Sequence, residues 1–68
     1  MFIVQEGFGP VQEGVDKCWS VRNTRMTFNT KEKAERFSER RYERMVKVYQ
    51  RTQPDWWKSY WVRTVEVE

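Results

Sequence analysis

A long stretch without helix-breaking residues is the feature that most constrains this chain. Residues 31–50 contain neither glycine nor proline, and apolar side chains recur among them at the spacing of an amphipathic helix. Asn29 or Thr30 is suited to cap the start of this helix, and Pro54 lies just past its end. We therefore predict one helix from Thr30 to Arg51, roughly 30 Å long.

Short β-prone segments flank the predicted helix on both sides. Glycine and proline mark Glu6–Pro10 as a turn or loop, and Asn23–Arg25 is a plausible tight turn that would make a hairpin of the segments beside it. The predicted strands are, in order, Phe2–Val4, Cys18–Arg22, Met26–Phe28 and Trp61–Val67. This order, β-β-β-α-β, predicts an α+β fold in which a small antiparallel sheet of three to four strands packs on the helix.

The length of 68 residues predicts a single small domain, residues 1–68, with little room for a core. Cys18 is the only cysteine and histidine is absent, so neither an intrachain disulfide nor a zinc site is expected. Aromatic residues make up 16% of the chain, and their large side chains can replace an aliphatic core. The apolar face expected to supply the core consists of Ala34, Phe37, Tyr42, Met45, Val48 and Tyr49.

The charge balance limits the partners to be expected. The net charge is +3 with 34% charged residues, which permits contact with nucleic acid or an acidic protein surface and argues against DNA mimicry. No apolar run reaches transmembrane length, and no signal peptide is recognisable. With a single thiol, the expected setting is the reducing cytoplasm.

The polar side of the predicted helix carries two separate rows of charge. The acidic row is Glu32, Glu35, Glu39 and Glu43, and the basic row is Lys33, Arg36, Arg40, Arg44, Lys47 and Arg51. Glu32–Arg36 and Glu43–Lys47 have the i,i+4 spacing of helical ion pairs. The rows are either a solvated surface or, for the basic row, a contact surface for phosphates or an acidic protein groove; Arg36, Arg40, Arg44 and Lys47 are its candidate binding residues.

Arg41 falls near the apolar face of the helix. Its stem is expected to lie along the edge of the core while its charged head reaches water. Glu66 or Glu68 is the candidate partner for that head.

A tryptophan-rich segment follows the helix. Alternation along an extended chain would place Trp57 and Trp61 on one side and Trp56 and Tyr60 on the other. One pair is then expected to close the core against Phe37, Met45 and Trp19, while the other lies on the surface.

The outward pair of that segment is a candidate binding surface, since tryptophan, tyrosine and arginine are enriched at binding hot spots. With nearby cations it also suits stacking of nucleobases or association of two copies of the chain. The candidate partner-binding residues of this segment are Trp56, Trp57, Lys58, Tyr60 and Arg63.

Chemistry that would indicate an enzyme is missing. No histidine is present to act as a general base or to pair with Cys18 as nucleophile, and Cys18 is expected to be a core residue. The glycines at positions 7, 9 and 14 match no phosphate- or dinucleotide-binding motif. We predict no catalytic, cofactor-binding or metal-binding residues.

Two stretches, Trp19–Asn23 and Phe28–Phe37, resemble a strand–turn–strand–capped-helix unit found in small proteins of phages and mobile elements. They are also loosely similar to the arm-type DNA-binding domains of tyrosine recombinases, whose three-stranded sheet enters the major groove. The similarity covers about a third of the chain and excludes the tryptophan-rich segment. It implies a small accessory protein, viral in origin, that acts through contacts in the host cytoplasm.

The sequence therefore predicts a non-enzymatic accessory protein that binds and modulates a macromolecular partner, which we expect to be a protein. The alternative is direct binding of nucleic acid through the basic row and the aromatic–basic segment. Self-association is a third hypothesis.

Overall fold

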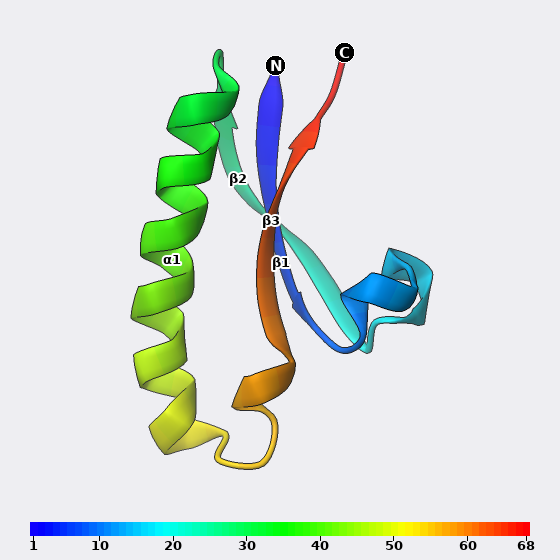
Figure 1. The fold of residues 1–68 in the computed structure, drawn as a ribbon, viewed down its shortest axis with the longest axis vertical. Helices are drawn as coiled ribbons and strands as arrows, with labels where there is room; N and C mark the ends of the chain where they lie inside the picture. Colours follow the sequence, from blue (N-terminus) through cyan, green and yellow to red (C-terminus); the bar gives the residue numbers. More distant parts are fainter.

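The N-terminal strand, β1 (Phe2–Phe8), is the central strand of an antiparallel sheet in the computed structural model, which describes all residues from 1 to 68 (Figure 1). β2 (Ser20–Phe28) pairs with one edge of β1 and β3 (Tyr60–Glu66) with the other, which gives the order β2-β1-β3. The helix α1 (Lys31–Thr52) packs on one face of this sheet. The predicted α+β fold, a small antiparallel sheet on one long helix, is confirmed.

The segment between β1 and β2 contains two single turns of 3-10 helix, Val11–Glu13 and Val15–Lys17. The predicted loop at Glu6–Pro10 begins too early, because β1 continues through Gly7 to Phe8. Cys18 ends the second turn and precedes β2; it is a free, half-buried thiol rather than a strand residue of the core.

The predicted hairpin between residues 18 and 28 is wrong, because this stretch is one strand interrupted by a bulge. Gln5 of β1 pairs with Asn23 and Ile3 pairs with Thr27, so residues 24–26 all lie opposite Val4. The Thr24 hydroxyl donates to the Val4 carbonyl at 3.0 Å and accepts from the Met26 amide at 3.4 Å. Arg25 has a φ of 70° there. The polar residues predicted to form a turn thus form a bulge, and the parts of β2 before and after them both pair with β1.

The helix begins and ends where the sequence predicted. Thr30 is the N-cap, and its side-chain oxygen accepts a hydrogen bond from the Lys33 amide at 3.3 Å. The amide of Gln53 closes the last turn on the Tyr49 carbonyl at 2.7 Å, immediately before Pro54. The predicted helix is therefore confirmed.

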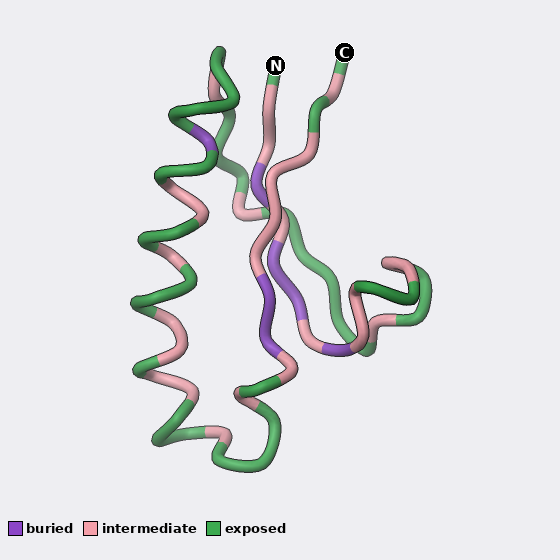
Figure 2. Tube along the Cα trace, viewed as in Figure 1, coloured by how far each residue is buried: buried purple, intermediate pink, exposed green.

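The core lies between α1 and the sheet and is small (Figure 2). Val4 of β1 and Ala34 of α1 are fully buried. Phe8, Tyr49 and Tyr60 form an aromatic cluster with ring centroids 5.1–5.4 Å apart. Large aromatic rings thus replace much of the aliphatic core that this short chain lacks.

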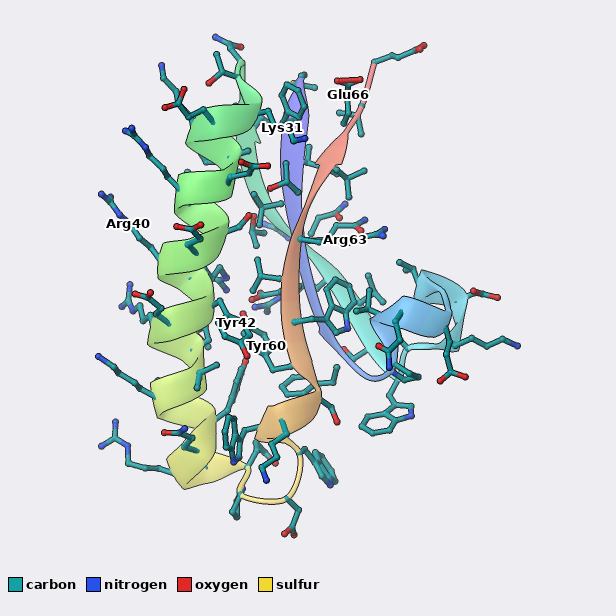
Figure 3. The ribbon with its side chains drawn as sticks, viewed as in Figure 1. Lys31, Arg40, Tyr42, Tyr60, Arg63 and Glu66 are labelled. Carbon is teal, nitrogen blue, oxygen red and sulfur yellow. The ribbon has the colours of Figure 1, made fainter.

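Two aromatic residues expected in the core lie outside it. Trp19 is 68% exposed, so it closes no part of the core. Tyr42 is also exposed and stacks at the edge on Tyr60, with centroids 5.7 Å apart (Figure 3). In contrast, Phe37 and Met45 are partly buried, and the Phe37 ring lies 5.4 Å from that of Phe28 on β2.

The second face of the sheet carries the one buried tryptophan, Trp61. Tyr60 points toward α1, so the next residue along β3, Trp61, points to the opposite face. The Trp61 indole lies over Gly7, its cross-strand partner. A side chain at position 7 would collide with this ring. Arg63 continues this face: its guanidinium lies 5.8 Å from the Trp61 ring and donates twice to the Gln5 side-chain oxygen.

Candidate functional site

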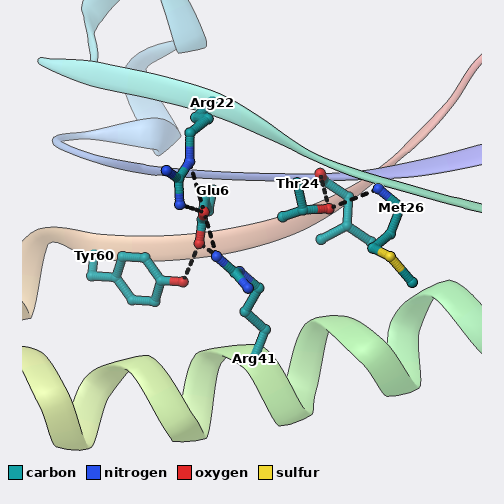
Figure 4. A network of polar contacts seen from close by, with 7 residues as sticks. Glu6, Arg22, Thr24, Met26, Arg41 and Tyr60 are labelled. Atoms are coloured by element: carbon teal, nitrogen blue, oxygen red, sulfur yellow. Dashed lines mark hydrogen bonds and ion pairs between the residues drawn. The ribbon is translucent and has the colours of Figure 1, made fainter.

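A carboxylate surrounded by donors lies between the sheet and the helix (Figure 4). Glu6 of β1 is only 3% exposed. It accepts from Arg41 of α1 at 2.7 and 2.8 Å, from the Tyr60 hydroxyl at 2.8 Å, and from Nε and Nη2 of Arg22. Three donors, from α1, β2 and β3, therefore meet at one buried residue of β1, and this network ties the helix to all three strands.

Arg41 does not use the partner proposed from the sequence. The expectation of Glu66 or Glu68 is wrong, because the guanidinium points into the layer between helix and sheet, where Glu6 lies. The two residues are 35 positions apart, so no local pattern in the sequence indicates this pairing.

The network keeps Glu6 ionised. Burial by itself raises the pKa of the carboxyl, but hydrogen bonds from Arg41, Arg22 and Tyr60 outweigh it and lower the pKa to about 2. The same hydrogen bonds to Glu6 raise the pKa of both arginines. Two guanidinium groups thus share one carboxylate, and the cluster retains one net positive charge.

An open aromatic groove adjoins this network at the end of the molecule where α1 finishes. Its volume is about 580 Å³, and its walls include two of the most exposed apolar side chains, Trp19 at 68% and Trp56 at 59%. A smaller hollow of about 180 Å³ shares three lining residues with it and extends to Arg22. The groove residues are Phe8, Trp19, Ser20, Tyr49, Gln53 and Trp56.

The tryptophan-rich segment is not the extended strand that the alternation argument assumed. Residues Trp57–Ser59 form a turn of 3-10 helix, and β3 begins only at Tyr60. The prediction that Trp56 and Tyr60 share one side of an extended segment is wrong, because Tyr60 is 4% exposed and its hydroxyl is bound to Glu6. Trp56 alone of this pair lies on the surface.

The remaining predicted site residues of this segment lie apart from the groove. Trp57 is half-buried, with the Lys58 ammonium 5.9 Å from its ring. Arg63 lies on the sheet face opposite the helix. Trp56 is therefore the one predicted residue of the segment that the structure brings to the groove.

The charged rows of the helix lie on opposite flanks. Phe37 marks the flank facing β2 through its contact with Phe28. Arg40 and Arg44 follow Phe37 by three and seven residues, so they share that flank. The acidic row lies toward β3, where Glu39 and Glu43 line a hollow with Val62.

The basic row is mostly free of ion pairs. Arg36 pairs with Glu32 at 3.3 Å, as predicted, whereas Arg40, Arg44 and Lys47 are exposed and pair with no carboxylate. The predicted Glu43–Lys47 pair is not formed. Figure 3 shows Arg40 pointing away from the sheet. These cations are available to a partner.

The sequence did not identify Trp19, Phe8 and Glu6 as part of a site. Glu6 sits next to an apolar run, and a carboxylate that alternates with Val4 and Phe8 on one face of a strand is the only local signal of its burial. Trp19 and Trp56 line the same groove only because β2 begins near the end of α1.

No group of three or more histidine, cysteine or acidic side chains is placed to bind a metal ion. None of the helices combines the length and the apolar composition needed to cross a bilayer. Comparison with protein-family models, curated proteins and solved structures finds no match.

Proposed function

We propose that this chain is a non-enzymatic accessory protein of the cytoplasm that binds and modulates a protein partner, with the aromatic groove as the contact site. The observation that carries the proposal is the pair of exposed tryptophans, Trp19 and Trp56, on the walls of an open apolar groove. Exposed indoles keep apolar surface in water, and burial of a tryptophan anchor is a common source of binding energy at protein interfaces.

The polarity of the groove favours a protein over nucleic acid. Four of its six lining residues are apolar and none is charged. The unpaired cations Arg40, Arg44 and Lys47 lie on the helix rather than in the groove. These cations, together with indole rings that can stack on bases, support direct binding of nucleic acid as the second candidate.

Selection from a random peptide library tests the proposal. We expect wild-type protein to enrich peptides that no longer bind when Trp19→Ala and Trp56→Ala are combined. Trp57→Ala is the matched control, because Trp57 is outside the groove, and it should retain binding. Circular dichroism would verify that each variant is folded.

A titration with single-stranded and duplex oligonucleotides at low salt decides between the candidates. Unchanged tryptophan fluorescence and anisotropy would agree with protein binding. Strong, salt-sensitive binding of oligonucleotides, with no peptide enriched over the double variant, would overturn the proposal in favour of nucleic acid.

A further inference from the structure

The outer edge of β2 offers unpaired backbone beside the aromatic groove. β2 pairs with β1 alone, and its residues make no backbone hydrogen bond to any other element. The bulge at residues 24–26 interrupts the strand, so Ser20–Asn23 is the regular part of this edge. Such an edge is a template for another strand, because its outward amides and carbonyls have no protein partner.

This short edge runs directly into the groove. Ser20 lines the groove, and Trp19, which precedes it, forms part of the wall. Ser20 and Arg22 also line the adjoining hollow. An extended chain paired with Ser20–Asn23 would therefore pass the groove at one end, where a large apolar side chain could enter between Trp19 and Trp56.

The charges around the edge define the chemistry of the occupant. The Arg22 side chain is 66% exposed, and it uses Nε and Nη2 for Glu6, which leaves the Nη1 hydrogens without a protein acceptor. The Glu6 network keeps a net positive charge, and Arg40 and Arg44 lie on the same flank of the molecule. The acidic row lies on the other flank. An acidic segment complements this surface.

The same charges argue against a second copy of the chain. Antiparallel self-pairing about a two-fold axis at Val21 or Arg22 would set the two Arg22 side chains on one face, diagonal to each other or directly opposite. It would also bring two basic rows to one interface, and neighbouring like charges destabilise strand pairs. Nucleic acid also fits the edge poorly, because phosphates accept hydrogen bonds but cannot donate them to the exposed carbonyls. A peptide supplies both donors and acceptors.

We propose that the edge of β2 at Ser20–Asn23 and the aromatic groove together receive an extended acidic segment of a partner protein. The segment adds a fourth strand beside β2, sets a carboxylate against Arg22, and places an apolar side chain between Trp19 and Trp56. This inference rests on the proposed function and specifies the partner's chemistry and its mode of binding.

The peptides enriched from the random library provide the test. We expect them to contain an aromatic or aliphatic anchor flanked by aspartate or glutamate. Arg44→Glu should weaken their binding roughly three- to tenfold, since a charge facing the peptide becomes repulsive. Lys31→Glu is the matched control, because it changes the net charge by the same amount as Arg44→Glu but on the flank of α1 that faces β3. Lys31 lies there 3.9 Å from Glu35, and this variant should leave the affinity unchanged.

Backbone N-methylation of one enriched peptide tests strand addition itself. N-methylation of the peptide amides that face β2 should abolish binding. N-methylation of the amides between them should be tolerated, because only every second amide of a strand faces its neighbour. Enriched peptides that depend on both tryptophans but lack acidic residues, or show no alternation, would overturn this inference and leave the proposed function standing. Failure to enrich any peptide would overturn both.

Discussion

Arg41 and Glu6 form a two-pronged ion pair that joins the helix to the central strand. Nε and Nη2 of Arg41 donate to the two carboxylate oxygens of Glu6 at 2.7 and 2.8 Å. Glu6 is almost completely buried. In a protein with so little apolar core, this pair is a main contact that holds α1 on the central strand.

Replacement of Arg41 with alanine should destabilise the protein by about 2–4 kcal/mol, because a buried carboxylate is left with only Arg22 and Tyr60 as donors. Urea unfolding measures this loss. Arg36→Ala, which removes the exposed pair with Glu32, is the control and should cost no more than about 0.5 kcal/mol. Equal losses in the two variants would contradict a special role for the buried pair.

The stability of the protein should depend on the ionisation of Glu6 in acid. Because the folded-state pKa is lowered from 4.5 to about 2, the contribution is complete above pH 4.5 and is lost as the pH falls toward 2. The shift corresponds to about 3 kcal/mol. Unfolding measured from pH 6 to pH 2 in wild type and Glu6→Gln tests this.

The Glu6→Gln variant should be less stable near neutral pH and lose less stability in acid, because its amide does not titrate. Parallel pH profiles for the two proteins would show that other carboxyl groups cause the acid dependence.

Thr30→Ala should lower stability by about 1 kcal/mol, because the Lys33 amide loses its acceptor at the start of α1. Thermal unfolding should show a midpoint lower by roughly 4–8 °C, as expected for a domain of this size. Asn29→Ala is the matched control, since Asn29 precedes the cap and makes no side-chain hydrogen bond. A larger loss of stability in Asn29→Ala than in Thr30→Ala would contradict the assignment of Thr30 as the N-cap.

Gly7→Ala should destabilise the sheet by about 2–3 kcal/mol, because a well-packed site has no space for another carbon. The added Cβ would press against the Ser20 carbonyl oxygen and lie 2.7 Å from Cζ2 of Trp61. Val21→Ala, at the position paired with Gly7 on β2, should cost less than about 1 kcal/mol since Val21 is exposed. Unfolding in urea compares the two, and a harmless Gly7→Ala would mean that the Trp61 indole can shift.

The helix was predictable because its determinants are local. Thr30 as the cap, the absence of breakers and the spacing of Ala34 and Phe37 all act within a few residues of one another. The separation of acidic and basic rows follows from helical geometry alone, so it too was visible in the sequence. Which row faces which strand was not, because that depends on how the helix is rotated on the sheet.

The errors arose where distant segments meet. Residues 23–25 look like a turn when considered alone, but β1 pairs along both halves of β2 and holds them in one strand. Similarly, alternation through Trp56 and Tyr60 failed because the chain turns at residues 57–59 before entering the sheet.

The sequence alone thus determined the α+β class, the bounds of α1 and the surplus of aromatic side chains, since these follow from local propensity and composition. Only the tertiary structure decided that Tyr60 is a buried donor to Glu6, that Arg41 is its ion-pair partner, and that Trp19 joins Trp56 at one groove. Each of these contacts links residues more than 30 positions apart, and no local pattern encodes which distant strand or helix a side chain will meet.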